Sequence, residues 1–261
     1  MASNKPAAFA GGAIVGALGG LIGLGGAEFR LPLLISVYGF GALAAVIMNK
    51  AMSLIVVAFS LPFRTAAIPI ADVLAAWPIV VNILAGSLLG AWFGAGWATR
   101  LKSKTLFKTI AVLLVLIAII LFFGHGVHGT GGPPISGVAL IISGVVVGFA
   151  IGVVAALMGV AGGELLIPTL ILLFGVDIKL AGSLSLAISL PTMIVGFARY
   201  SRDRAFDVIK ENSGFALAMA VGSIVGAFVG SLLLGLVDES VLLPVLALIL
   251  VLSAFKVWRH D

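Results

Sequence analysis

The chain has 261 residues, of which 62% are hydrophobic and 10% are charged, and its mean hydropathy is +1.30. Soluble domains carry about 25% charged residues, so this composition excludes a soluble protein and predicts an all-α polytopic membrane protein. The formal charge is +5. The basic residues lie mostly in short loops between apolar segments, where positive-inside bias explains them, so we expect no nucleic-acid partner. The chain has no cysteine, which excludes disulfides, thiolate catalysis and cysteine metal sites.

Apolar segments follow one another in two similar series. Each series begins with two segments that we expect to be short, and three full-length candidates follow. The two short segments of the first half do not reach the roughly 20 residues that a transmembrane helix needs. The segments are 7–22, 27–38, 42–62, 73–98 and 106–123 in the first half, and 136–158, 164–174, 181–197, 214–236 and 241–257 in the second. We expect a first transmembrane repeat at 1–124, an extracytoplasmic linker at 125–134 and a second transmembrane repeat at 135–261.

A glycine-rich stretch with charged residues separates the first two segments of each series. It reads Gly-Leu-Gly-Gly-Ala-Glu-Phe-Arg-Leu-Pro at 23–32 and Gly-Val-Ala-Gly-Gly-Glu-Leu-Leu-Ile-Pro at 159–168. A carboxylate beside a helix break in both halves of a membrane protein points to the binding site of a transporter. We assign the helix breaks to Gly23, Pro32, Gly159 and Pro168.

The two stretches belong to a longer internal repeat. A constant shift of 136 positions places Glu28 on Glu164 and Ser53 on Ser189 without a gap, which indicates a duplication. Each copy crosses the membrane three or five times, depending on whether its short helix pair is re-entrant. Both numbers are odd, so we expect inverted repeats. Close helix packing is predicted by matching small-residue stripes, Gly86, Gly90 and Gly94 with Gly222, Gly226 and Gly230.

Basic residues divide unevenly between alternate loops. If both termini are cytoplasmic, only Arg64 and Lys179 fall on the outer side. The cytoplasmic side then holds Lys5, Arg100, Lys102, Lys104, Lys108, Arg199, Arg202, Arg204, Lys210, Lys256 and Arg259. This distribution fits positive-inside bias. We therefore expect an integral protein of the inner or plasma membrane with both termini in the cytoplasm.

Two further cations lie inside predicted membrane segments, Arg30 beside the first glycine-rich stretch and Lys50 in the middle of the third segment. A charge at that depth costs roughly 2.5–3.5 kcal/mol on insertion scales, so each cation needs a partner or a task. One alternative for Lys50 is a buried ion pair with Glu28 that only stabilises the bundle, and the other is anion binding. Leucine stands at both equivalent positions of the second half, so we expect an asymmetric site.

An oxyanion that leaves water needs hydrogen-bond donors and positive charge. Free amides at the start of a helix supply donors, and hydroxyl, amide and cationic side chains near the breaks add to them. The substrate-binding candidates are Gly25, Gly26, Arg30, Asn49, Lys50, Ser53, Gly162, Gly163, Ser185 and Ser189. The serines also fit a second interpretation, in which their hydroxyl groups bond only to the helix backbone.

Glu28 and Glu164 repel an anion when they are ionised, so we assign them to proton coupling. Burial favours the neutral form of a carboxyl group, and its protonation can then be linked to anion binding. The alternative is a structural role, because a carboxylate in the first turn of a helix interacts favourably with the free amides there. Inverted repeats bring equivalent elements together, so we expect both carboxyl groups near one shared cavity.

The duplicated pattern, Gly-x-Gly-Gly-x-Glu-x-x-x-Pro in the first half and Gly-x-Ala-Gly-x-Glu-x-x-x-Pro in the second, resembles the TauE/SafE family of membrane permeases, the sulfite exporters. The resemblance covers nearly the whole chain and implies a secondary carrier of small sulfur-containing anions. It also implies that both stretches are central to transport. The copies depart from a full triple glycine at Ala27 and Ala161.

We therefore expect a secondary transporter that exports sulfite, an organosulfonate or thiosulfate and is coupled to a gradient through the two carboxyl groups. The alternative is an anion channel, or a permease for another small organic or inorganic anion. No hydrolase, metalloprotease or nucleotide-binding motif is present, so we expect no enzyme, no cofactor and no metal site. The expected partners are the lipid bilayer, the small anion and a proton or other coupling ion, and a homo-oligomer is left open.

Overall fold

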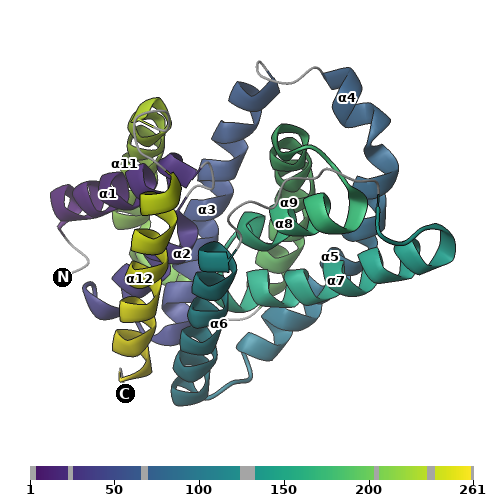
Figure 1. Cartoon of the computed structure of the whole chain (residues 1–261). Helices are drawn as coiled ribbons and strands as arrows, with labels where there is room; N and C mark the ends of the chain where they lie inside the picture. Colours follow the sequence, from purple (N-terminus) through teal and green to yellow (C-terminus); the bar gives the residue numbers. More distant parts are fainter. Residues whose placement is uncertain are drawn as a thin grey trace.

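The structure is a computed structural model that describes residues 4–22, 26–65, 70–123, 133–202, 206–233 and 239–259. Every regular element in these ranges is a helix, as the composition predicts (Figure 1). The helices are α1 (Lys5–Ile22), α2 (Ala27–Ser36), α3 (Ala42–Thr65), α4 (Ile70–Ala75), α5 (Trp77–Ala98), α6 (Ser103–Phe123), α7 (Gly137–Met158), α8 (Gly163–Phe174), α9 (Ile178–Tyr200), α10 (Asp207–Glu211), α11 (Ser213–Leu233) and α12 (Glu239–Trp258).

Six helices in the described part of the chain are long and apolar enough to cross a membrane, namely α3, α5, α6, α7, α9 and α11. The prediction of a polytopic membrane protein is therefore confirmed at this level. The expectation of a short segment at 136–158 is wrong, because α7 is a continuous helix of 22 residues. Its glycines do not end it, since a backbone in lipid satisfies its polar groups by remaining helical.

The segment expected at 73–98 is divided into two helices. α4 ends at Ala75, and α5 begins at Trp77 with Pro78 in its first turn. Proline has no amide hydrogen, so it fits the first turn of a helix but in the interior leaves a carbonyl of the preceding turn without its donor. The new helix start therefore follows from Pro78.

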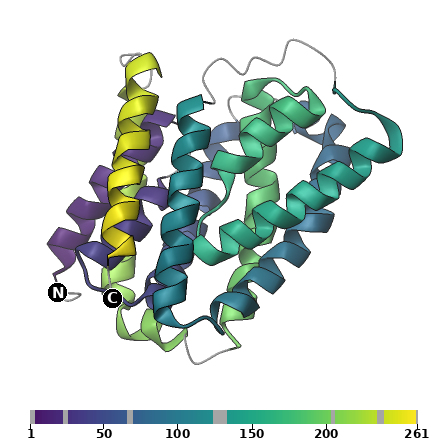
Figure 2. The same cartoon turned by 60° about the horizontal axis from the view of Figure 1, so that its bottom comes forward.

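Helix pairs repeat across the two halves of the molecule. α1 packs against α11, and α5 packs against α7 (Figures 1 and 2). The shift of 136 residues relates α1 to α7 and α5 to α11, so the two pairs are equivalent. α3 also packs against its equivalent α9, and α6 against its equivalent α12. The contacts therefore follow the sequence repeat, while the inverted orientation of the halves in a membrane remains a prediction.

Glycines bring the paired helices into close contact. A side chain at Gly16 would overlap the backbone carbonyl of Ser223, and one at Gly152 would overlap the backbone carbonyl of Ser87, which are equivalent contacts in the two halves. The same backbone-to-backbone approach occurs along both predicted stripes, at Gly86, Gly90, Gly94, Gly222, Gly226 and Gly230. Residue numbers rise together along the two facing helices, so each pair runs parallel. The predicted packing role of these glycines is confirmed.

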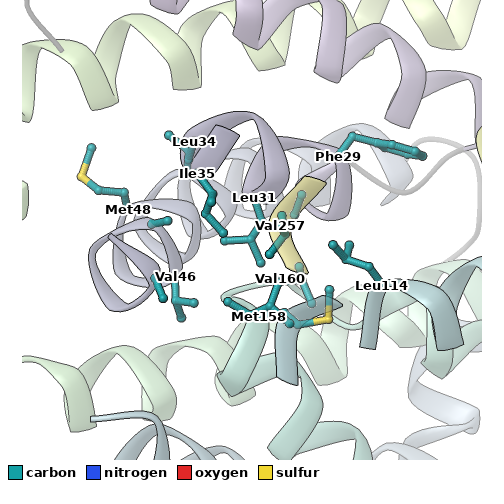
Figure 3. Packing of buried hydrophobic residues seen from close by; sticks show 14 of the residues in the cluster. Phe29, Leu31, Leu34, Ile35, Val46, Met48, Leu114, Met158, Val160 and Val257 are labelled. Atoms are coloured by element: carbon teal, nitrogen blue, oxygen red, sulfur yellow. The ribbon is translucent and has the colours of Figure 1, made fainter. Parts of the chain in front are cut away.

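An apolar core joins α2 and α3 to parts of α6, α7 and α12. Figure 3 shows buried side chains from these helices and from the turn that follows α7 in one cluster, including Phe29, Leu31, Leu34, Ile35, Val46, Met48, Leu114, Met158, Val160 and Val257. The ten-residue helix α2 has eight buried residues, and two of them are the charged Glu28 and Arg30. The apolar residues of α2 therefore fix the position of its charged residues inside the protein.

Candidate functional site

Glycines with left-handed backbone torsion angles form the helix breaks. Gly26 (φ 69°) precedes α2, Gly159 (φ 66°) ends α7, and Gly162 (φ 83°) precedes α8. Glycine adopts this conformation without the steric penalty that a Cβ atom brings. Gly23 and Gly25, which the sequence predicts as break and binding residues, lie outside the described residues.

Pro32 and Pro168 lie inside α2 and α8 and not at the breaks to which the sequence assigns them. Proline donates no amide hydrogen to the carbonyl four residues earlier in a helix. In the two halves these carbonyls belong to Glu28 and Glu164. The Glu-x-x-x-Pro spacing therefore leaves the backbone carbonyl of each glutamate without its usual helical donor.

Arg30 is fully buried and is held by three neutral side chains. Its Nε donates to Asn49 Oδ1 at 2.8 Å, its Nη1 donates to Ser223 Oγ at 3.1 Å, and its Nη2 donates to Ser53 Oγ. A guanidinium has five N–H donors, so these three bonds leave two donors without a partner among the described residues. The cation is therefore oriented by helices α3 and α11 but is not neutralised by them.

Three side chains of α3 bond to the end of α7, which is the second break. The bonds join Lys50 Nζ to the Ala155 carbonyl at 3.1 Å, Asn49 Nδ2 to the Met158 carbonyl at 3.1 Å, and Ser53 Oγ to the Gly159 carbonyl at 3.4 Å. The last carbonyls of a helix have no intrahelical donors, and its C-terminal end attracts cations. Asn49 and Ser53 therefore supply donors to the last carbonyls of α7. The Ala155 carbonyl already accepts from backbone amides at the end of α7, and Lys50 is an additional donor to it.

Asn49 connects both breaks to Arg30. Its Nδ2 donates to the carbonyl of Ala27, the first residue of α2, at 3.0 Å, in addition to the bond to α7. Its Oδ1 accepts the bond from Arg30. One buried amide therefore holds the guanidinium, the start of α2 and the end of α7 in a single hydrogen-bond network.

Lys50 is fully buried and lies between α7 and α9. Gly196 of α9 makes room for it, because a Cβ atom there would lie 2.9 Å from Lys50 Cε. The described residues show no ion pair between Lys50 and Glu28, and both carboxyl oxygens of Glu28 lack a hydrogen-bond partner among them. The described contacts therefore do not support the interpretation of Lys50 as the ion-pair partner of Glu28.

Glu28 and Glu164 lie together although they are 136 positions apart in the sequence. Both are buried, with 0% and 5% of their surface exposed, and their carboxyl groups are close enough to interact. The Oε2 atom of Glu164, like both oxygens of Glu28, has no hydrogen-bond partner among the described residues. Their predicted proximity is confirmed, and the shared cavity remains a prediction.

The second half contributes fewer polar contacts. Gly162 and Gly163 open α8, where free amides occur. Ser185 Oγ donates to the Gly182 carbonyl at 2.8 Å, so it bonds to its own helix. Ser189 Oγ is buried without a partner among the described residues. The described network is therefore centred on Arg30 of the first half, with the asymmetry that the sequence predicts.

Comparison with known proteins identifies the family of the chain. A family model described as "Sulfite exporter TauE/SafE" matches residues 8–257, which include both glycine-rich stretches. The chain belongs to the TauE/SafE sulfite exporter family. This is a family of membrane transporters, in agreement with the apolar helices of the structure. The search of curated proteins and the search of solved structures each found no match.

In this TauE/SafE protein, two further residues contact the predicted site residues: Ser223, which accepts from Arg30, and Gly196, which lies beside Lys50. Neither was among the residues predicted from the sequence. The sequence offered a sign of Ser223, because this serine follows a glycine of the small-residue stripe, as its equivalent Ser87 does in the first half. Ser87 Oγ pairs with Thr192 Oγ1 at 2.8 Å and does not contact Arg30. The role of Gly196 had no signal, because the space that it leaves for Lys50 depends on the contact between α3 and α9.

Proposed function

We propose that this TauE/SafE protein is a secondary transporter that exports small anions of the sulfite, organosulfonate or thiosulfate class. The observation that carries the proposal is Arg30, a buried cation whose three hydrogen-bond acceptors are neutral side chains. A charge in a dry interior needs a partner of opposite sign. The oxygens of a sulfur oxyanion suit the planar, forked donors of a guanidinium.

Other predicted residues complete the anion site around Arg30. Asn49 and Ser53 hold the guanidinium in place, and Lys50 adds positive charge on the same helix. Donors also come from the free amides that open α2 and α8, at Gly26 and at Gly162 with Gly163, and from the hydroxyl group of Ser189. The anion thus exchanges its water shell for protein donors.

Glu28 and Glu164 supply the coupling in this mechanism. Each carboxylate repels a nearby anion, and protonation removes that repulsion. Anion binding and proton binding therefore favour each other. The anion and the proton are then released together. A proton gradient can then influence the direction of anion transport.

The movement that carries the anion is a change in the packing of the two halves. Transporters built from inverted repeats expose a central site alternately to the two sides of the membrane when one bundle rocks against the other. The equivalent pairs α1–α11 and α5–α7, each of which joins a helix of the first half to a helix of the second, are the candidates for two such bundles. Asn49 joins their two breaks, so it lies where the movement is centred.

Purified protein in liposomes tests the proposal directly. Vesicles filled with sulfite, methanesulfonate or thiosulfate should release the anion faster than protein-free vesicles, and a pH gradient should change the rate. Arg30→Leu, which copies the leucine at position 166, should abolish release, whereas the exposed control Arg100→Leu should retain it. Normal transport by Arg30→Leu would contradict the proposal, and single-channel currents far above carrier turnover would favour an anion channel.

A further inference from the structure

We infer that Glu28 and Glu164 form one carboxyl pair that shares a single proton in the anion-free protein and takes up one more proton when an anion binds beside Arg30. The inference rests on the proposed function and specifies its coupling ion and stoichiometry. It treats the two glutamates as one titrating unit, although they belong to different halves of the chain.

The geometry of the pair is the first argument. Asn49 Nδ2 donates to the carbonyl of Ala27, next to Glu28, and to the carbonyl of Met158, at the break that leads into α8, so the two breaks lie beside each other. Both carboxyl groups are almost completely buried there, and they interact with each other. When two carboxyl groups share a dry site, ionisation of one disfavours ionisation of the other, and the protons belong to the pair. One proton between them leaves a single negative charge and allows one carboxyl group to donate a hydrogen bond to the other.

The unpartnered oxygens are the second, independent argument. Both oxygens of Glu28 and Oε2 of Glu164 lack a hydrogen-bond partner among the described residues. A buried carboxylate in that condition loses its hydration without replacement, which is expensive. A structural helix-start role would satisfy these oxygens with backbone amides. The free oxygens therefore point to a mobile proton as the missing ligand.

The charges around the pair are the third argument. Arg30 on α2 is the cation that interacts with Glu28, and Lys50 on the neighbouring α3 directs its ammonium group to α7. The other charged residues of the helices that pack against α2 and α8 lie near helix ends: Lys5, Arg64, Lys104, Lys108, Lys179, Arg199, Glu239 and Lys256. The single negative charge of the pair therefore serves as the counter-ion of Arg30.

Anion binding changes this charge balance in a defined way. The incoming anion replaces the carboxyl pair as the counter-ion of Arg30, and one proton from the solution binds to the remaining carboxylate. Both carboxyl groups are then neutral, so they no longer repel the anion. On release, the proton leaves with the anion and the pair regains its negative charge. A monovalent anion and one proton thus move together without net charge, while a divalent anion moves with the same single proton.

Infrared spectroscopy of the anion-free protein tests the shared proton before any substrate is known. At neutral pH the wild type should show the carbonyl band of a protonated carboxyl group. Glu28→Gln and Glu164→Gln should each lose this band, because the remaining carboxylate stays ionised as the counter-ion of Arg30. Absence of the band in the wild type, or its persistence in both single variants, would overturn the inference and leave the proposed anion transport untouched.

Proton uptake on anion binding tests the stoichiometry. Full-length protein in weakly buffered detergent solution is titrated with methanesulfonate and with thiosulfate, while a pH indicator reports protons and calorimetry reports bound anion. We expect one proton per anion for both probes in the wild type and in each single glutamine variant. The double variant Glu28→Gln/Glu164→Gln should bind anion without taking up protons.

The outcomes distinguish a failure of the shared proton from a failure of the proposed anion transport. Two protons per anion in the wild type, or none, would overturn the shared proton while anion binding itself supports the proposed function. A requirement for sodium in place of proton uptake would overturn the coupling ion. If no sulfur anion binds at all, the proposed function fails, and the infrared band still decides whether the pair exists.

Discussion

Lys50 of α3 donates a hydrogen bond from its ammonium group to the backbone carbonyl of Ala155 in α7, at a distance of 3.1 Å. The two residues come from different halves of the chain and are 105 positions apart. A cation near the C-terminal end of a helix interacts favourably with the helix dipole. The charge of Lys50 therefore lies beside the break between α7 and α8.

Lys50→Met tests whether that charge serves anion binding. We expect the affinity for the anion to fall about tenfold, equivalent to ~1.4 kcal/mol, when it is measured by calorimetry. The melting temperature in detergent should change little, because the variant removes a buried charge together with its hydrogen bond. Leu186→Met, at the equivalent position of the second half, is the control. Failure of Lys50→Met to fold would show that the ammonium group is mainly structural.

Ser223→Ala tests the positioning of Arg30 by α11. The change removes the acceptor of Arg30 Nη1, and the loss of one buried hydrogen bond should cost about 1 kcal/mol of stability. Anion affinity should fall about fivefold, because the guanidinium loses its fixed orientation. The equivalent variant Ser87→Ala removes a bond to Thr192 and should lower the melting temperature without changing affinity. Equal effects of both variants on affinity would refute this role of Ser223.

The glycine contacts between the halves predict equal effects at equivalent positions. Gly16→Ala and Gly152→Ala both place a Cβ atom into a backbone carbonyl of the facing helix. Each should lower the free energy of unfolding by about 1–3 kcal/mol, which is typical of overpacking. Gly41→Ala is the control, because no atom lies within 4 Å of its Cβ position. Melting curves in detergent followed by tryptophan fluorescence provide the measurement, and a stable Gly16→Ala variant would contradict the close approach.

The predicted membrane orientation can be tested with single cysteines, because the chain has none. A cysteine at position 103 should react with an impermeant reagent only from the cytoplasm, and one at position 128 only from outside. The predicted orientation places Lys108 and the C-terminus on the same, cytoplasmic side. In agreement with this, Lys108 Nζ lies 5.3 Å from the ring of Trp258 near the C-terminus. The side chain of Lys5 lies beside Gly214, next to the predicted cytoplasmic loop. Reversed labelling at both positions would overturn the orientation, and labelling from the same side would overturn the inverted repeat.

The protein class, the family and the position of the two breaks can be predicted from the sequence alone. Apolar composition and sparse charge are sufficient to identify membrane helices, because lipid excludes other open backbone structures. The repeat is visible at Glu28 and Glu164 because both copies preserve the residue type and the distance to a proline. The same local reasoning failed for the segment 136–158, which was expected to be short although α7 is a helix of 22 residues. It also failed for Pro32 and Pro168, which lie inside α2 and α8.

The partners of the buried charges become visible only when the helices are packed together. Arg30 bonds to Ser223, which is 193 positions away, and Lys50 bonds to the Ala155 carbonyl near the end of α7, 105 positions away. Such contacts depend on how closely helices approach and in which direction their side chains point, and the glycines of α1 and α11 set that approach from both sides. Sequence spacing describes one helix at a time, whereas the environment of a buried charge is formed by several helices that are distant in the chain.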